Sequence, residues 1–137
     1  MVDNIDEITK TLQDAIFADY SRKLKEELFN AENVGTIENP DSQVRITGVC
    51  GDTLEMSLRI HGKKIYGIKF TTDGCGFTVA CANYVARRAK GKTIKEAWVI
   101  EPDDVDRYFE GLPKENKHCA KLAVITLRAL LKAFTFN

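Results

Sequence analysis

The sequence predicts an α+β fold, in which a small antiparallel sheet of about three strands packs against several helices and a long N-terminal helix comes first. Three observations carry this prediction. Apolar residues recur at helical spacing before residue 30, alternate with polar residues in the middle of the chain, and return to helical spacing after residue 76. Because the strands are grouped and the later helices are grouped, we expect the helices to cover one face of the sheet.

The N-terminal helix is predicted over residues 5–29, with room for one break. Its apolar residues fall three or four positions apart, as on one face of a helix: Ile5, Ile8, Leu12, Ile16, Tyr20, Leu24 and Leu28. Residues 30–42 are rich in Asn, Gly and Pro, which predicts a surface loop. Alternating apolar residues then predict three strands, at 44–46, 54–60 and 65–72.

The rest of the chain predicts helices, at 77–90, 93–99, 102–109 and 117–134. Gly91 ends the first of them, because glycine tolerates the backbone turn that follows a helix. Thr93 is a candidate cap for the second, and Pro102 stands in the first turn of the third. After the N-terminal helix, the order of elements is therefore strands first and the remaining helices after them.

Length and charge limit the functions that the chain can have. A chain of 137 residues fits one domain, which we place at residues 1–137. Lys and Arg total 20, and so do Asp and Glu, so the chain has no basic field to attract nucleic acid or an anionic membrane. No segment approaches the roughly 20 apolar residues of a membrane helix, and the N-terminus mixes acids with isolated aliphatics. We therefore expect a cytoplasmic protein with neither nucleic acid nor membrane as a partner.

Four cysteines in a cytoplasmic chain favour metal binding or thiol chemistry, because a reducing thiol pool disfavours disulfides. Three of them stand at predicted element boundaries: Cys50 in Gly48-Val49-Cys50-Gly51, Cys75 between Gly74 and Gly76, and Cys119 after His118. Flanking glycines let the backbone turn sharply and let a bulky inorganic cluster come close. The alternative is that each thiol is an isolated small hydrophobe. Since no CxxC pair is present, any shared site must be assembled by folding.

Local geometry separates the candidate ligands. Cys50 and Asp52 are two positions apart, so in an extended segment both side chains point to one side and can share a metal. Cys75 and Cys119 stand at predicted helix N-termini, which favour the thiolate form. His118 can be a ligand or proton carrier, or simply a surface residue. Cys81 lies inside a helix and is expected in the core.

These residues, in this order, resemble the IscU/NifU-type iron-sulfur scaffold family. The match runs from about Tyr20 to Leu131 and is specific because a whole set of short motifs recurs in order. The motifs are Asn33-Val34-Gly35, Cys50-Gly51-Asp52, Gly74-Cys75-Gly76, Gly91-Lys92 with a following Ala97, and Leu112-Pro113 leading to His118-Cys119.

The resemblance implies a scaffold rather than an enzyme, with three thiolates and a fourth ligand, Asp52 or His118, holding a transient 2Fe-2S cluster. It implies that iron and sulfur are cargo, that a cysteine desulfurase supplies sulfur as a persulfide, and that apo iron-sulfur proteins receive the cluster. In this interpretation Cys119 is the sulfur acceptor, and Cys50 and Cys75 are cluster ligands. Asp52, a harder ligand than a thiolate, is the expected exit point of the cluster.

Two comparisons with the family refine this expectation. Family members use a Leu-Pro-Pro-Val-Lys segment to dock a DnaK-type chaperone, but here Leu112 and Pro113 are followed by Lys114, Glu115 and Asn116. The docking motif is altered, so the resemblance does not support chaperone-assisted release. The zinc-dependent sulfur-transfer branch carries an insertion between its second and third cysteines, and this chain has none apparent, which favours the scaffold branch.

Two other functions remain open from the sequence. In the first, Cys50, Asp52, Cys75 and Cys119 hold a tetrahedral zinc ion in a sulfurtransferase or zinc protein, and zinc can also occupy an apo scaffold. In the second, the chain is an interaction module that keeps the fold and binds no metal. Metal content distinguishes all three.

Overall fold

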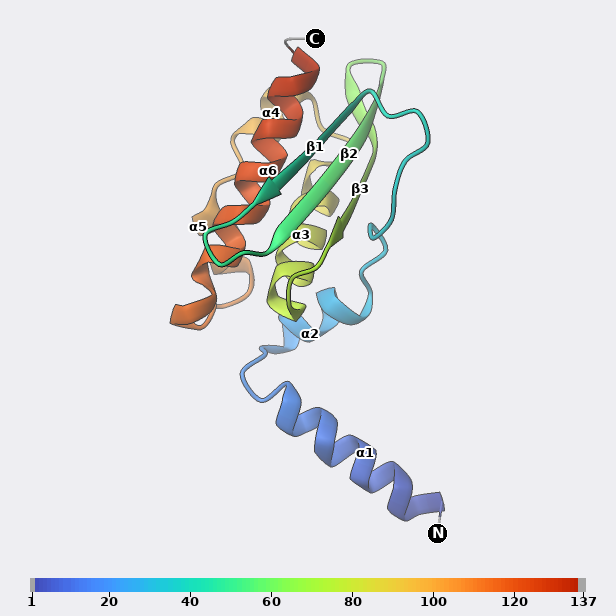
Figure 1. Cartoon of the computed structure of the whole chain (residues 1–137), viewed down its shortest axis with the longest axis vertical. Coiled ribbons are helices and arrows are strands. Elements are labelled where there is room, and N and C mark those ends of the chain that lie inside the picture. Colours follow the sequence, from blue (N-terminus) through green and yellow to red (C-terminus); the bar gives the residue numbers. More distant parts are fainter. Residues whose placement is uncertain (1, 136–137) are drawn as a thin grey trace.

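The structure of the protein is a computed structural model that describes residues 2–135. Its helices pack behind a β-sheet (Figure 1). Strands β1, β2 and β3 form one antiparallel sheet in that order, and helices α3 and α6 cover one face of it. The predicted α+β class is confirmed. The elements are α1 (Val2–Ile16), α2 (Arg22–Phe29), β1 (Ser42–Thr47), β2 (Thr53–His61), β3 (Lys64–Thr72), α3 (Gly76–Ala89), α4 (Ile94–Trp98), α5 (Pro102–Tyr108), a 3-10 turn (Lys114–Asn116) and α6 (Lys117–Thr135).

The core lies between the sheet and helices α3 and α6. On the central strand β2, alternate residues face the helices, and Leu54, Met56 and Leu58 are fully buried. Met56 pairs with Val44 on one side and Phe70 on the other, a register that holds along β2 as far as a shift between Arg59 and Ile60. Four of the ten buried residues of α3 are alanines, and these small side chains let the helix pack closely against α6 and β3.

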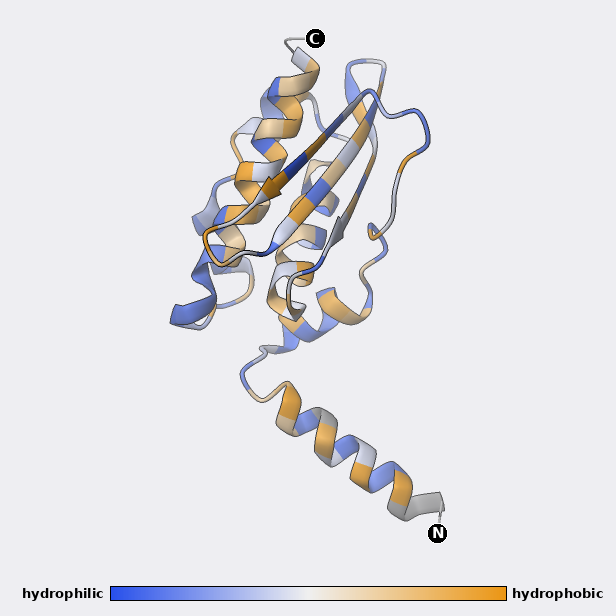
Figure 2. Cartoon of the chain, in the orientation of Figure 1, coloured by the Kyte–Doolittle hydropathy of each residue, from blue (hydrophilic) through white to orange (hydrophobic). Residues whose placement is uncertain are grey.

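The predicted N-terminal helix is divided into two helices of 15 and 8 residues. Helix α2 starts afresh because the Ser21 hydroxyl accepts a hydrogen bond from the Leu24 backbone N–H at 3.2 Å. Between the helices, Phe17 packs edge-on against Tyr20 and Phe29. Helix α1 projects away from the rest of the chain, and its apolar stripe, visible in Figure 2, stays exposed at Ile5, Ile8, Leu12 and Ile16.

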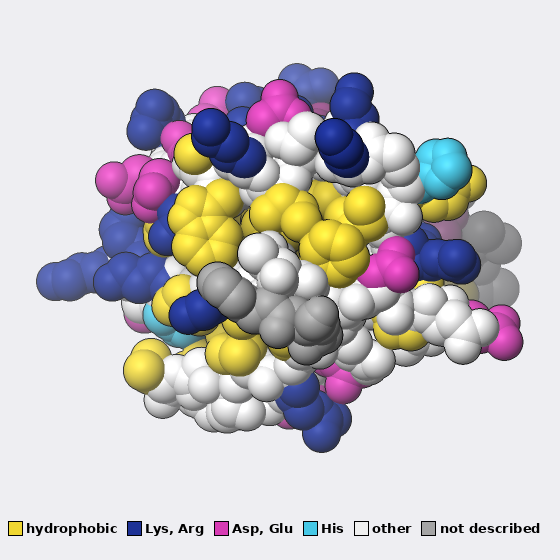
Figure 3. Space-filling view, turned by 90° about the horizontal axis from the view of Figure 1, so that it is seen from above, with side chains coloured by type: hydrophobic (Ala, Val, Ile, Leu, Met, Phe, Trp, Pro, Cys, Tyr) yellow, Lys and Arg dark blue, Asp and Glu magenta, His cyan; other side chains and the backbone are white. Residues whose placement is uncertain are grey.

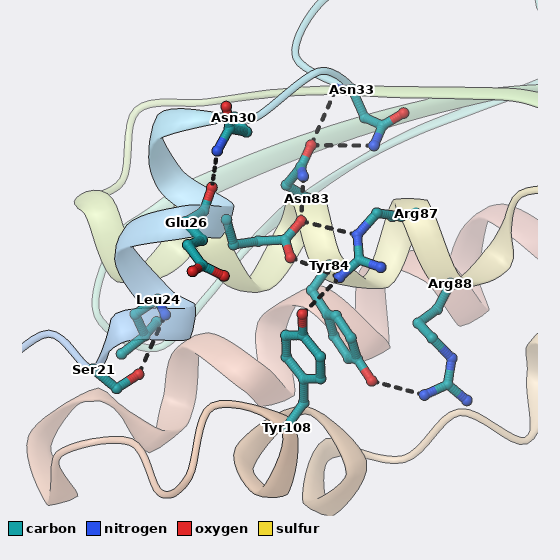
Figure 4. Close-up of polar contacts among 11 residues, drawn as sticks. Ser21, Leu24, Glu26, Asn30, Asn33, Asn83, Tyr84, Arg87, Arg88 and Tyr108 are labelled. Carbon is teal, nitrogen blue, oxygen red and sulfur yellow. Dashed lines mark hydrogen bonds and ion pairs between the residues drawn. The ribbon is translucent and has the colours of Figure 1, made fainter.

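A polar clamp joins α2 to α3 (Figure 4). The Glu27 carboxylate is only 6% exposed and accepts hydrogen bonds from the Asn83 amide and from Arg87, the latter at 2.7 Å. Asn83 in turn accepts a hydrogen bond from the Asn33 backbone N–H at 3.0 Å, which fixes the start of the following loop. The clamp holds α2 beside α3, whose N-terminus carries Cys75.

One end of the molecule carries charges of both signs. Figure 3 looks onto the end of the molecule that holds the C-terminal end of α6 and the β2–β3 turn. Hydrophobic side chains gather in its middle, and both basic and acidic side chains surround them. Within residues 2–135, no helix combines the length and apolar character that crossing a bilayer requires.

Candidate metal centre

Three separate elements bring the predicted site residues to one end of the sheet. The β1–β2 loop carries Cys50 and Asp52, the N-terminus of α3 carries Cys75, and the first turn of α6 carries His118 and Cys119. Cys50, Asp52 and His118 each offer a ligand atom, and these atoms lie within 4.8 Å of one another. The site is thus assembled by folding, as its sequence spacing requires.

A buried hydroxyl links the other members of the site. Thr78 Oγ1 lies 3.3 Å from Asp52 Oδ2, 3.4 Å from Cys119 Sγ and 4.0 Å from Cys75 Sγ. Together with the first group, it brings all five predicted residues into one cluster. Thiolates, a carboxylate and an imidazole are suitable ligands for iron or zinc.

Glycines shape the loop that carries Cys50. The Gly48 backbone N–H donates to the Asp52 carbonyl at 2.8 Å, and the Gly51 N–H donates to the Gly48 carbonyl at 3.0 Å. Gly51 has a φ of +91°, a conformation that strains other residues. A Cβ on Gly48 would lie 3.3 Å from Leu122 of α6, so glycine lets the loop lie close to the helix that carries Cys119. Cys50 itself is exposed.

Cys75 occupies the N-cap position of α3 and is exposed, with no cap hydrogen bond from its side chain. The structure gives a different reason for its two flanking glycines than room for a cluster. A Cβ on Gly74 would lie 2.8 Å from Thr78, and a Cβ on Gly76 would overlap the Tyr20 phenol oxygen. Both glycines are therefore required by the close packing of the protein around Cys75.

Cys119 is the buried thiol of the site. It is the third residue of α6, has no exposed surface, and its sulfur lies 3.7 Å from His118 Nε2. Burial raises the pKa of Cys119 to about 11, although the hydrogen bond with Thr78 acts in the opposite direction. The prediction that the helix N-terminus favours the thiolate is wrong for Cys119, because desolvation outweighs it. A bound cation would reverse the balance.

Cys81 is apart from the site. It is fully buried in α3, as predicted, and burial raises its pKa well above the ordinary value. Thr78, by contrast, is a site residue that the sequence did not indicate. Its one local signal is its position three residues after Cys75, which places the two side chains on the same side of the first turn of α3.

Known proteins resemble this chain over most of its length. The NifU-like N terminal domain family matches residues 19–136. The iron-sulfur cluster assembly scaffold protein IscU 1 of Archaeoglobus fulgidus is 39% identical over 120 residues, which cover 86% of this chain and 78% of the relative. The corresponding protein IscU of Escherichia coli is 32% identical over 117 residues, covering 82% of this chain and 91% of the relative.

A solved structure agrees in fold. The N-terminal part of a NifU-like protein from Brucella abortus superposes with a TM-score of 0.70 at 18% identity, covering 89% of this chain and 98% of that one. Helix α1 ends before the family match begins at residue 19, while every site residue lies inside it. The chain belongs to the family of NifU-like N-terminal domains.

Proposed function

We propose that this chain is a scaffold, a single domain over residues 1–137, that assembles a labile 2Fe-2S cluster on Cys50, Cys75 and Cys119 and transfers it to apo-proteins. Membership in the family and the scaffold names of its relatives support the general role. The observation that carries the specific proposal is the convergence of three elements. One buried hydroxyl lies near the Cys75 and Cys119 sulfurs and Asp52, and Cys50 lies near Asp52 and His118. Iron and sulfide are cargo in this proposal, so the protein is not an enzyme.

The two exposed thiols and the carboxylate suit a site that must release its contents. Cys50 and Cys75 are exposed, so an acceptor's thiol can reach a metal bound there. Asp52 or His118 supplies the fourth ligand, and both are partly exposed. A carboxylate is a weaker partner than a thiolate for sulfide-bridged iron, so we propose Asp52 as the exit point.

Cys119 is proposed as the sulfur acceptor. His118 Nε2, 3.7 Å away, can take the thiol proton, and the Cys119 thiolate then attacks the outer sulfur of a persulfide on a cysteine desulfurase. The sulfur–sulfur bond of the donor breaks, its cysteine leaves as a thiolate, and a persulfide forms on Cys119. Because Cys119 has no exposed surface, this step requires the β1–β2 loop or the start of α3 to move.

The proposed partners are therefore a cysteine desulfurase and apo iron-sulfur proteins, in the cytoplasm, where the four cysteines stay free. We propose no chaperone step. Leu112, the first residue of the altered docking segment, is 4% exposed, and its backbone N–H donates to Asp106 at 2.8 Å. The apolar start of that segment is therefore buried in the protein itself, while Lys114 and Glu115 are exposed.

Anaerobic purification followed by absorption spectroscopy and metal analysis tests the proposal. A brown protein with equal iron and sulfide supports a scaffold, a colourless protein with stoichiometric zinc supports the zinc alternative on the same ligands, and no metal under any condition supports an interaction module. Reconstitution of Ser variants then identifies the ligands. Cys50→Ser, Cys75→Ser and Cys119→Ser should each abolish a stable cluster, whereas Cys81→Ser is the matched control and should retain it.

A further inference from the structure

We propose that Thr78 is a positioning residue of this site, whose hydroxyl holds the Asp52 carboxylate and the Cys119 sulfur in place before metal binds. The inference rests on the proposed metal-binding function, but it concerns a residue outside the predicted ligand set. A hydroxyl has one proton to donate and two lone pairs that accept. With its proton given to Asp52 Oδ2 at 3.3 Å, the oxygen accepts from the Cys119 thiol at 3.4 Å.

The environment of Thr78 indicates that this hydroxyl serves the site. Thr78 is 1% exposed, and a buried threonine in a helix commonly bonds the carbonyl four residues earlier. Thr126 does so in this protein, donating to the Leu122 carbonyl at 2.7 Å. Thr78 instead directs its hydroxyl between a carboxylate and two sulfurs. The neighbouring Gly74 leaves the room that this arrangement needs, since a Cβ there would lie 2.8 Å from the threonine side chain.

The contacts of Asp52 show what the hydroxyl does mechanically. Among residues 2–135, Thr78 supplies the one hydrogen bond to the Asp52 carboxylate, which is partly exposed at the end of the β1–β2 loop. That loop is otherwise closed by its own short backbone bonds at Gly48 and Gly51. Thr78 therefore ties the loop to α3 and, through Cys119, to α6. Ligands fixed in this way lose less freedom when a metal arrives, and partners of this kind change metal affinity about 10- to 100-fold.

Three variants and one probe ion test the inference. Thr78→Val replaces the hydroxyl with a methyl of similar size, Thr78→Ser keeps the hydroxyl, and Thr126→Val removes a buried hydroxyl outside the site. Anaerobic titration with Co²⁺ reports both the affinity and, through its absorption bands, the ligand geometry. Thr78→Val should weaken Co²⁺ binding about tenfold and shift the bands, while Thr78→Ser stays within about threefold of the unmodified chain and Thr126→Val leaves the bands unchanged.

A metal-free measurement separates this inference from the proposed function. Hydrogen exchange of the Gly48 and Gly51 amides should accelerate in Thr78→Val and not in Thr126→Val, because only the first variant frees the loop. If the unmodified chain binds no metal but Thr78→Val still loosens the loop, the proposed function fails and the positioning role stands. If Thr78→Val keeps its fold, its loop exchange and its Co²⁺ spectrum, the positioning role is overturned while the scaffold proposal is unaffected.

Discussion

In the metal-free protein, alkylation of Cys119 should be at least about tenfold slower in the native state than in the unfolded chain. Burial raises the pKa of this thiol from 9.0 to about 11. At pH 8 a rise of about 2 lowers the thiolate fraction about 100-fold, whereas the more basic thiolate is about eightfold more nucleophilic. The two effects leave a rate about tenfold lower, before the steric protection of a sulfur with no exposed surface is counted.

The alkylation rate of native Cys119 should rise with pH. Native Cys119 stays mostly protonated between pH 8 and pH 10, so its rate of alkylation should rise about tenfold per pH unit, whereas the rate of the unfolded chain should level off above pH 9.

The raised pKa of Cys119 also makes stability depend on pH, because the unfolded chain releases this proton first. Its contribution to stability is therefore constant below pH 9 and is lost between pH 9 and pH 11, by up to about 2.7 kcal/mol.

Timed iodoacetamide labelling in the presence of a chelator, with peptide mass spectrometry, measures each cysteine separately. Exposed Cys50 serves as the internal control, because its labelling should be fast in both states. The reasoning is refuted if Cys119 labels as fast in buffer as in urea. It is also refuted if the native rate of Cys119 levels off near pH 9.

Three further predictions concern the ligand loop and the supports of the site. Asp52→Ala should still assemble a cluster but lose it more slowly in air and to an apo-ferredoxin, because the carboxylate is the proposed exit point. Glu27→Ala should lower the free energy of unfolding in urea by about 1–3 kcal/mol, since it leaves the buried Asn83 amide without its acceptor. Glu26→Ala breaks only an exposed pair and should cost under about 0.5 kcal/mol. Gly76→Ala should cost about 1–3 kcal/mol and reduce metal binding at Cys75, because its Cβ would displace the Tyr20 phenol.

Each of these has a contrary outcome. Faster cluster decay in Asp52→Ala would make the carboxylate a needed ligand instead of an exit point. Equal urea midpoints for the two glutamate variants would mean that the α2–α3 clamp adds little to stability. Gly67→Ala is the control for the glycine, because its Cβ would lie at an ordinary 3.7 Å from Ile37, and an equal loss there would remove the steric explanation.

Local patterns predicted the elements well because each depends on a short stretch of chain. Alternation at 54–60 identified the central strand, and Thr93 does cap its helix, where Glu96 completes a capping box. The sequence allowed for a break in the N-terminal helix but did not show where it falls. Tyr20 continues the apolar spacing of α1, yet its ring lies against Phe77, with the ring centroids 4.1 Å apart. Apolar spacing alone does not show which neighbour a side chain will meet.

The sequence predicted which residues form the candidate site but not the surroundings of each residue. Glycine-flanked or histidine-flanked boundary thiols indicated which residues converge. Cys119 is buried where α6 meets Thr78 of α3, a contact between distant segments that no short motif encodes. Thr78 was missed for the same reason, since its partners Asp52 and Cys119 are remote in sequence.

Because the thiols come from the β1–β2 loop, α3 and α6, an ion bound to all of them would also be a cross-link between the sheet and both covering helices. Such a cross-link cannot form in the extended chain, so binding energy becomes folding energy and grows with the concentration of free metal relative to its dissociation constant. A loaded molecule would then resist heat and proteases better than an emptied one. Release of the bound ion would leave the protein in its least stable state. The supply of metal would then help to set how long each molecule survives.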